Sequence, residues 1–314
     1  MRKKAIIISL KGTKISKQEK ILLSKENPWG VILFRRNLKT FAQIKNLIRS
    51  IRYLTKDKNF PILIDEEGMK VSRLRNIINN NISANYFGKL YQKDKDLCLK
   101  LLKLYLASLC KILKNLGINI NTIPVLDVSR SKTNDVIGNR SFSKNKTIVK
   151  KLGHFVVSQL HKNKTASVIK HIPGHGCAVS DSHKIMPKVT LSKKKLNQKD
   201  FFPFKNSKAK FAMTAHILYK KIDSKNVATF SKRIIKEIIR KKIGFRGIIL
   251  SDDISMKALK YDLVKNAQKS LEAGCNLVLY CAGNTKDNFK LIKSLPYIDK
   301  FTAKKTSEFY NFLR

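Results

Sequence analysis

The residues from 170 to 183 carry the highest density of reactive side chains in the sequence. Lys170-His171-Ile172-Pro173-Gly174-His175-Gly176 is followed, after a short gap, by Asp181-Ser182-His183. Because Asp181 stands two residues before His183, its carboxylate can orient the imidazole and stabilise the protonated form. The pair therefore predicts an acid/base centre. The proline and glycines before it indicate a loop that can close and carry His183 to a substrate.

The same histidines allow two other interpretations, a metal site and a purely structural role. A metal site would draw on His171, His175, Asp181, His183 and His216. However, a glycine-rich loop offers no helical face with ligands four residues apart, and the chain has no HxH or HExxH pattern. We expect acid/base chemistry here, with no metal and no cofactor.

A second candidate group is the pair of aspartates that ends the segment from Gly247 to Asp253. Asp252 and Asp253 follow an apolar run, where a buried strand would end. A carboxylate nucleophile facing a separate proton donor is the arrangement of a retaining glycosidase, which passes through a covalent glycosyl-enzyme. The alternative is that one aspartate caps the following helix. With two adjacent aspartates, one can cap while the other reacts.

Eight short apolar runs supply the elements that must position these groups. Their hydrophobicity is continuous rather than alternating, which is typical of strands buried on both faces of a parallel sheet. The runs are Ala5–Leu10, Val31–Phe34, Ile62–Ile64, Ile118–Val125, Ser167–Ile169, Phe211–Met213, Ile248–Leu250 and Asn276–Tyr280. Segments with helical periodicity lie between most of them. One has Phe41, Ile44, Leu47, Ile48 and Ile51 on one face, and Thr40 with Gln43 predicts a capping box.

Eight strands alternating with helices predict an α/β fold, a single (β/α)8 barrel of the TIM type, with residues 1–314 as one catalytic domain. A doubly wound open sheet is the alternative, weakened because the turn from Ser9 to Gly12 has only one glycine. Barrel chemistry takes place at the carboxyl ends of the strands. Most of the runs end in reactive residues, so we expect these to share one rim. They are Arg36-Asn37, Asp65-Glu66-Glu67, Asp127, Lys170-His171, His216, Asp252-Asp253 and Cys281.

At these residues the sequence resembles glycoside hydrolase family 3, and within it the short bacterial β-N-acetylglucosaminidases of peptidoglycan recycling. The active-site signature of the family matches Ile238-Ile239-Arg240, Gly244-Phe245-Arg246-Gly247 and Ser251-Asp252. In that signature the reactive carboxylate follows the Ser/Thr, which selects Asp252 over Asp253. The segments around His175 and His183 resemble the loop of the subfamily, in which a histidine assisted by an aspartate replaces the usual carboxylate acid/base. The resemblance extends over nearly the whole chain.

The resemblance implies hydrolysis of a terminal β-N-acetylglucosaminide with retention, from cytoplasmic GlcNAc–anhydro-muramyl peptides. Asp252 would be the nucleophile and His183, oriented by Asp181, the acid/base. Substrate binding would fall to Asp65, Arg73, Arg140, Lys170 and His171. Met69 and Lys70 depart from the glycine and arginine that the family usually has, which changes the loop beside Asp65 because lysine cannot replace a bidentate guanidinium.

Three alternatives to this hydrolase remain open. The first is phosphorolysis, because a histidine repels phosphate less than a carboxylate would. The second is substrate-assisted catalysis, with Asp65 and Glu66 as the acidic pair. The third is an inactive basic barrel that binds nucleic acid, other polyanions or cell-wall fragments through its surface.

The formal net charge of +45 is the dominant feature of the composition. Lysines are spread along the chain without interleaved aromatic residues, so we expect a compositional bias and no specific nucleic-acid partner. Five cysteines without a CxxC pair favour reduced thiols in the cytoplasm. The apolar run after Met1 is too short for a signal peptide, and no run approaches the length of a membrane helix. We expect a cytoplasmic monomer that acts on a small carbohydrate and binds no membrane.

Overall fold

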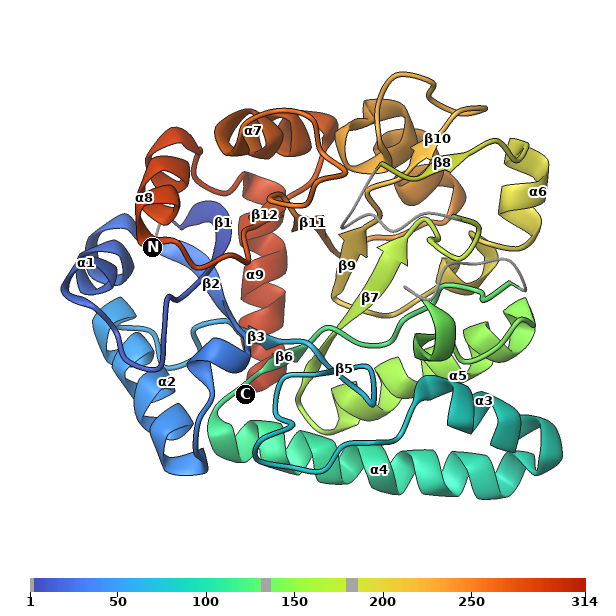
Figure 1. The fold of residues 1–314 in the computed structure, drawn as a ribbon, viewed down its shortest axis with the longest axis horizontal. Coiled ribbons are helices and arrows are strands. Elements are labelled where there is room, and N and C mark those ends of the chain that lie inside the picture. The colour runs from blue at the N-terminus through green and yellow to red at the C-terminus, as the bar shows by residue number, and fades with distance from the viewer. Residues whose placement is uncertain (1–2, 131–136, 179–185) are drawn as a thin grey trace.

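The computed structural model describes residues 3–130, 137–178 and 186–314. Eight parallel strands close into a barrel in the order β1-β12-β11-β9-β7-β6-β3-β2 (Figure 1). The prediction of a (β/α)8 barrel is therefore confirmed. The alternative prediction of an open sheet is wrong, because the first strand, β1, pairs with both β2 and the last strand, β12. The barrel strands are β1 (Lys4–Ser9), β2 (Pro28–Leu33), β3 (Ile62–Ile64), β6 (Ile120–Asn121), β7 (Ala166–Ile172), β9 (Phe211–Thr214), β11 (Ile248–Asp253) and β12 (Leu277–Leu279).

Every predicted apolar run overlaps a barrel strand, but the fourth run is paired over a shorter length than predicted. The run Ile118–Val125 predicts a long strand, whereas β6 covers two residues. Pro124 has no N–H to continue the ladder. The chain nevertheless stays beside β7, because Lys170 N donates to the Pro124 carbonyl at 3.2 Å and Leu126 N donates to the Lys170 carbonyl at 2.8 Å.

Helices surround the barrel on its outside, and two small ribbons lie beyond its strands (Figure 1). The α-helices are α1 (Lys17–Ile21), α2 (Phe41–Thr55), α3 (Ala84–Lys93), α4 (Lys95–Leu116), α5 (Lys146–Lys162), α6 (Lys193–Gln198), α7 (Leu263–Ala273), α8 (Thr285–Ser294) and α9 (Lys300–Leu313). Shorter or π-helical segments are η1 (Leu22–Glu26), η2 (Arg35–Asn37), η3 (Gly138–Arg140), η4 (Phe202–Phe204), η5 (Ala228–Phe230) and η6 (Ile234–Lys242). The ribbons pair β4 (Glu66–Gly68) with β5 (Val71–Ser72), and β8 (Lys188–Val189) with β10 (Leu218–Tyr219).

The α2 helix begins where its sequence predicts, with two differences in detail. Thr40 Oγ1 accepts from Gln43 N at 3.2 Å, but Gln43 Oε1 accepts from Lys39 N instead of from Thr40 N. The capping box is thus only half formed. Phe41, predicted on the buried face, is 37% exposed. Side chains on a helix lean toward its N-terminus, so that of the first residue extends past the packed turns.

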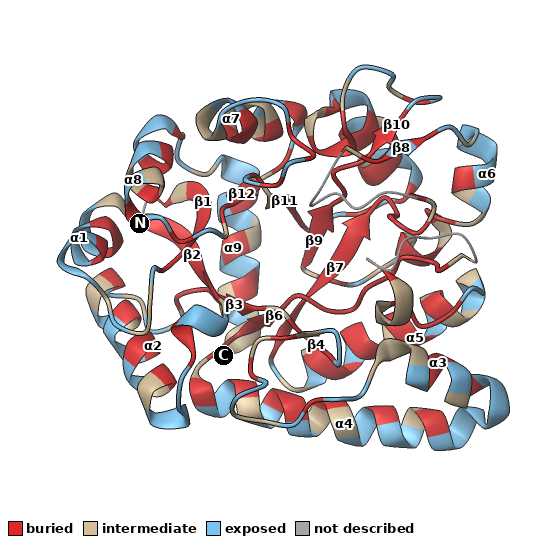
Figure 2. Ribbon diagram, viewed as in Figure 1, coloured by how far each residue is buried: buried red, intermediate tan, exposed pale blue. Residues whose placement is uncertain are grey.

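Two apolar layers hold the barrel together, one inside it and one between strands and helices (Figure 2). The inner layer reaches α9 at the amino ends of the strands. There Trp29 Nε1 donates to Thr306 Oγ1 at 2.9 Å. The centroid of the Trp29 ring lies 5.6 Å from that of Phe211 and 6.2 Å from that of Phe309. The helix α9 therefore closes one end of the barrel, which leaves the carboxyl ends for a site. Within the described ranges, no helix is long and apolar enough to cross a membrane.

The contact between α3 and the segment after η3 depends on a missing side chain. A Cβ at Gly88 would lie 1.6 Å from the Phe142 carbonyl oxygen, whereas a Cβ at Gly12 meets nothing within 4 Å. We expect Gly88→Ala to lower the free energy of unfolding by about 1–3 kcal/mol, although alanine is the better helix former. Urea unfolding measures this, with Gly12→Ala as the control. Equal stability of the two variants would contradict the packing.

Candidate active site

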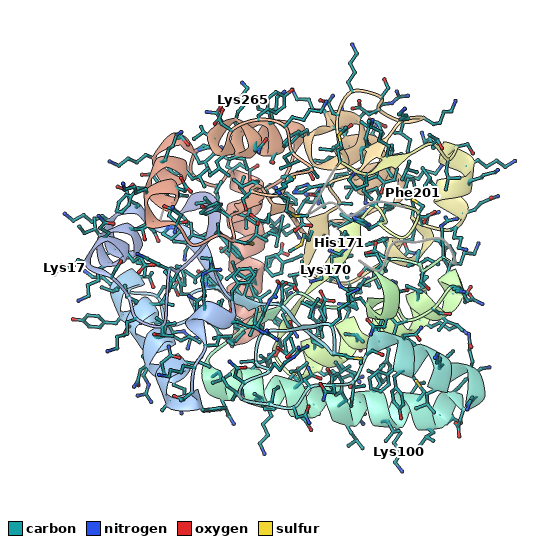
Figure 3. The ribbon with its side chains drawn as sticks, viewed as in Figure 1. Lys17, Lys100, Lys170, His171, Phe201 and Lys265 are labelled. Atoms are coloured by element: carbon teal, nitrogen blue, oxygen red, sulfur yellow. The ribbon has the colours of Figure 1, made fainter. Side chains whose placement is uncertain are left out.

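A cavity of about 300 Å³ opens at the carboxyl ends of the barrel strands. Its lining includes six of the eight site residues predicted from the sequence, namely Asp65, Arg73, Arg140, Lys170, His171 and Asp252. Figure 3 shows Lys170 and His171 in the middle of the ring of surrounding elements. The other two predicted residues, Asp181 and His183, lie outside the described residues.

Lys170 connects two carboxylates in this cavity. Its Nζ lies 2.6 Å from Glu67 Oε1 and 3.3 Å from Asp65 Oδ1, and it donates to Thr122 Oγ1 at 2.7 Å. The Lys170 side chain is only 3% exposed. A buried ammonium without a partner would be strongly unfavourable. The lysine and the two carboxylates therefore require one another.

Two arginines complete this charge network. Arg140 makes a bidentate pair with Glu67 at 2.7 and 2.8 Å, and Arg73 donates to Asp65 Oδ2 at 3.0 Å. Burial alone would raise the pKa of both carboxyls, but the nearby cations outweigh it. Lys170 and Arg73 hold the pKa of Asp65 well below its ordinary value. Arg140 and Lys170 lower the pKa of Glu67 from 4.5 to about 2. Both groups are therefore anionic.

Glu66, between these two carboxylates in sequence, faces away from the cavity. Its Oε2 accepts from the backbone N–H groups of Arg73 and Leu74 at 2.8 and 2.9 Å, and its Oε1 accepts from Asn80 at 2.6 Å. Glu66 thus fixes the β4–β5 hairpin that presents Arg73. The structure does not bring Asp65 and Glu66 together as an acidic pair, which removes the geometric basis for substrate-assisted catalysis by these two residues.

Asp127 anchors the loop that follows β7. It is fully buried, its Oδ2 lies 2.7 Å from His171 Nδ1, and its Oδ1 accepts from His175 N at 2.5 Å. Burial would raise the pKa of Asp127, but the His171 imidazole and the His175 N–H outweigh it and lower that pKa. Since Asp127 holds Nδ1 of His171, the Nε2 side of the ring is left for a ligand.

His175 lies beside His171 in the cavity, with the ring centroids 5.6 Å apart. Neither ring nitrogen has a partner among the described residues, although the residue is only 4% exposed. Burial, followed by the proximity of His171, lowers the pKa of His175 to about 4. The imidazole is therefore neutral near neutral pH, and one ring nitrogen can donate while the other accepts.

Asp252 is the last residue but one of β11, and it lines the cavity. Its Oδ1 accepts from Asp253 N at 2.8 Å. Burial would raise the pKa of Asp252, but the imidazoles of His216 and His171 and this N–H outweigh it, so the pKa lies below its ordinary value. The site therefore holds an ionised carboxylate without an ion pair among the described residues, which is the state that a nucleophile needs.

Asp253 differs from its neighbour in its contacts and in the direction of its pKa shift. Its Oδ1 accepts from Ser255 N and Cys281 N, both at 3.1 Å, and burial raises its pKa. The proposal that one of the two aspartates caps the next helix is wrong, because Asp262 caps α7. Asp253 instead fixes the turn after β11, which leaves Asp252 as the less constrained carboxylate.

His216 lies two residues after the end of β9, and its ring is held on both sides. Its Nε2 lies 3.0 Å from the Asp253 carbonyl oxygen and its Nδ1 lies 2.7 Å from Thr229 Oγ1. A carbonyl can only accept, so Nε2 carries the proton, and burial lowers the pKa of the ring. His216 is therefore a neutral imidazole with a fixed orientation. Within the described ranges, no group of three or more His, Cys, Asp or Glu residues could hold a metal.

The departures at Met69 and Lys70 fall in the turn between β4 and β5. Neither residue lines the described cavity. Met69 is 49% exposed, and its carbonyl accepts from Arg75 Nη2 at 2.5 Å. The change therefore lies next to the strand that presents Arg73 and not in the cavity itself.

Sequence reasoning missed the structural roles of Glu67, Thr122 and Asp127. Glu67 and Asp127 were visible only as acids after apolar runs, and nothing in the sequence pairs Glu67 with Lys170 and Arg140. Thr122 gives no signal of its own, because its hydroxyl matters only where it meets Asp65 and Lys170. His175 was recognised only as one possible metal ligand.

A parallel barrel with an ionised carboxylate at the end of its seventh strand, beside a network of carboxylates and cations, is typical of a barrel glycosidase. The comparisons with known proteins agree with this class. The family model described as the glycosyl hydrolase family 3 N terminal domain matches residues 2–304. The chain belongs to glycosyl hydrolase family 3.

Relatives and solved structures support the same assignment. Beta-hexosaminidases from Nitrosomonas eutropha and Haemophilus influenzae are each 33% identical, over 88% and 93% of this chain and 80% and 85% of their own. The crystal structure of NagZ from Neisseria gonorrhoeae in complex with N-trifluoroacetyl-D-glucosamine is 30% identical, with a TM-score of 0.88. The match covers 98% of this chain and 90% of that chain. The predicted resemblance is therefore confirmed at the level of the family, and the chain is a glycoside hydrolase.

The low pKa of Glu67 predicts a pH dependence of stability. A folded-state pKa of about 2, below the ordinary 4.5, stabilises the fold above pH 4.5, and this contribution is lost as the pH falls toward 2. We expect urea unfolding between about pH 5 and pH 3 to show a falling free energy of unfolding, by an amount on the order of 2 kcal/mol from this group. Glu67→Gln should be less stable at pH 5 but should lose less stability on acidification. An equal loss in both proteins would contradict the assignment.

Proposed function

We propose that this enzyme is a retaining exo-β-N-acetylglucosaminidase that removes terminal non-reducing β-linked N-acetylglucosamine. Asp252 is the nucleophile, and His183, oriented by Asp181, is the acid/base. The observation that carries the proposal is the ionised, little-constrained carboxylate of Asp252 in the same cavity as the network around Lys170. The naming of the relatives as beta-hexosaminidases supports the choice of sugar.

In the first step, an oxygen of Asp252 attacks the anomeric carbon while the bond from that carbon to the leaving oxygen breaks. His183 gives its proton to the leaving oxygen, and a covalent glycosyl-enzyme remains. In the second step, His183 takes a proton from water, whose oxygen attacks the anomeric carbon and releases Asp252 as a carboxylate. Two inversions give net retention.

The residues around Lys170 bind the sugar in this proposal. Hydroxyl groups both donate and accept, so they suit a cavity in which Asp65 accepts while Arg73 and Lys170 donate, and in which His171 presents its Nε2 side. Their mutual ion pairs hold these side chains in place before the substrate arrives, which reduces the loss of side-chain entropy on binding. Precise placement also lets Asp252 meet the anomeric carbon in line.

The natural substrate that we propose is a GlcNAc–anhydroMurNAc peptide released in cell-wall recycling. In this view residues 1–314 act as one catalytic domain, a cytoplasmic monomer without a cofactor. A phosphorylase is the second enzyme that this cavity could serve, because phosphate could replace water in the second step. Comparing the products formed with and without inorganic phosphate separates the two activities.

Covalent trapping tests the nucleophile directly. With a 5-fluoro glycosyl fluoride of N-acetylglucosamine, we expect one label per chain, located by peptide mass spectrometry on Asp252. Asp253→Asn is the matched control, since it removes the neighbouring carboxylate and should still take the label at Asp252. A label on Asp253, or none on any residue while the substrate is hydrolysed, would contradict the covalent route through Asp252.

Turnover of 4-nitrophenyl β-N-acetylglucosaminide tests both catalytic residues. We expect kcat to fall about 10³-fold or more in Asp252→Ala, and about 10²–10⁴-fold in His183→Ala, because each removes one chemical function from the reaction. The loss in His183→Ala should be larger for a sugar aglycone, whose oxygen needs protonation to leave, than for 4-nitrophenolate. Full activity in Asp252→Ala would rule out the proposed mechanism.

A further inference from the structure

In a second cavity, of about 430 Å³, all the charged residues of the described lining are positive. Its lining residues are Arg130, Lys144, Asn145, Lys146, Leu191, Lys195, Gln198 and Lys199. We call it the basic cavity. Five of these residues are cationic, and none of the described lining residues is an acid. The active-site cavity, by contrast, is lined by four acids and three lysines or arginines, so it is close to electrically balanced.

Two chain segments lead directly from the active-site cavity to the basic cavity. The first runs from Asp127, which holds His171, to Arg130, a Cα–Cα distance of at most about 11 Å for three residues. The second runs from Arg140, which lines the active-site cavity, to Lys144, at most about 14 Å for four residues.

The two segments are bonded to each other along the way. Ser129 N donates to the Ser143 carbonyl at 3.2 Å, and Ser141 Oγ donates to the Asp127 carbonyl at 2.6 Å. The basic cavity therefore lies within one short peptide length of the active-site cavity.

The loop after β7 makes a further connection between the active-site cavity and the basic cavity. Arg130 forms an ion pair with the buried Asp200 at 2.5 Å, and a Cβ at Gly174 would lie 2.8 Å from the Asp200 carbonyl oxygen. Lys199 and Gln198 precede Asp200 and line the basic cavity. The loop that follows His171 and carries His175 thus packs directly against the residues that build the basic cavity.

From these observations we infer that the basic cavity is a subsite for the carboxylates of an acidic peptide carried by the aglycone. The inference rests on the proposed function and names the part of the substrate that lies beyond the N-acetylglucosamine. A peptide arm of three or four residues spans up to about 10–14 Å, which is long enough to reach from one cavity to the other. The neutral sugar occupies the balanced cavity, and the anionic arm occupies the basic one.

The form of the basic cavity favours carboxylates spaced along a peptide over a single phosphate. Its lysines come from three places, the segment before α5, the first residue of α5 and the region of α6, so their charges are distributed. The N-terminus of α5, at Asn145 and Lys146, adds the positive end of a 17-residue helix. Lys146 is fixed by donating to the Gln198 carbonyl at 2.6 Å, whereas Lys144 and Lys195 are exposed and can reach a flexible arm.

A third cavity provides a matched control for the overall charge of the protein. It measures about 400 Å³, and its lining includes Lys208, Lys210, Arg246 and Lys305 with Glu308. Lys210 and Gly247 directly precede β9 and β11, so this cavity lies at the amino ends of the strands, opposite the active site. A general effect of positive charge would be changed equally by substitutions at either cavity.

The experiment compares Lys144→Ala/Lys195→Ala with Lys208→Ala/Arg246→Ala, which removes the same charge from exposed positions at the opposite end. Each protein is assayed with GlcNAc–anhydroMurNAc tripeptide, with the same compound after amidation of its carboxylates, and with the neutral 4-nitrophenyl glycoside. For the anionic substrate we expect the first variant to raise KM about five- to thirtyfold with little change in kcat, an effect that added salt reduces. Both neutral substrates, and the control variant with all three, should stay within about twofold of the unsubstituted protein.

Three results would overturn the inference. These are an unchanged KM for the anionic substrate in Lys144→Ala/Lys195→Ala, an equal rise in the control variant, and an equal rise for the amidated substrate. Affinities for the tripeptide compound, measured by calorimetry in an Asp252→Ala background, give the same comparison without turnover. If the unsubstituted protein cleaved neither the tripeptide compound nor the 4-nitrophenyl glycoside, the proposed function would be contradicted. The binding comparison would still show whether the basic cavity binds the acidic peptide.

Discussion

The pairing of the buried Lys170 ammonium with Asp65 and Glu67 is the interaction on which the active-site cavity depends. Lys170 lies in β7, Asp65 follows β3, and Glu67 belongs to the hairpin beyond β3. One lysine thus ties three separate segments to the same point. Because each buried charge would be strongly unfavourable alone, the positions of the segments are linked through the charges and not only through apolar packing. Arg140 and Arg73 extend the same constraint to η3 and to the end of the hairpin.

Carboxylates in this site fall into two groups with different roles. Those of Asp65, Glu67 and Asp127 are bound to cations, imidazole or backbone N–H groups and hold the architecture in place. Within the described part of the chain, Asp252 accepts a hydrogen bond only from the N–H of the next residue, and it remains ionised through its surroundings. A nucleophile paired directly with lysine or arginine would lose reactivity, since its charge would already be satisfied. The separation of Asp252 from the network around Lys170 is thus as informative as its presence in the cavity.

The sequence predicted the barrel and most of the cavity for a physical reason. A strand buried on both faces must be apolar throughout, so each polar residue that ends a run marks the rim of the barrel. Asp65, Lys170 and Asp252 could be located in this way.

The assignments of Arg73 and Arg140 came from family resemblance, because both lie in segments without such periodicity. The pairing of Glu67 with Lys170 and Arg140 depends on three-dimensional distances that no local pattern contains. The half-formed cap of α2 likewise depends on which backbone groups lie nearby, since Gln43 also reaches the Thr13 carbonyl at 2.7 Å.

The high positive charge of the chain does not extend to the lining of the active-site cavity. Lysine and arginine outnumber aspartate and glutamate by 66 to 21 over the whole sequence, yet acids outnumber these cations by four to three in the lining of the active-site cavity.

A compositional drift toward lysine can proceed on an exposed surface, where each substitution changes stability little. It cannot proceed where a carboxylate balances a buried cation, because replacing that acid would remove part of the charge that makes burial of the cation possible. Acids therefore persist where the fold needs them, and the electrical balance of the cavity follows from its own ion pairs. The charge of the surface can then vary, and in our proposal can recruit an anionic part of a substrate, without disturbing the carboxylate that we propose as the nucleophile.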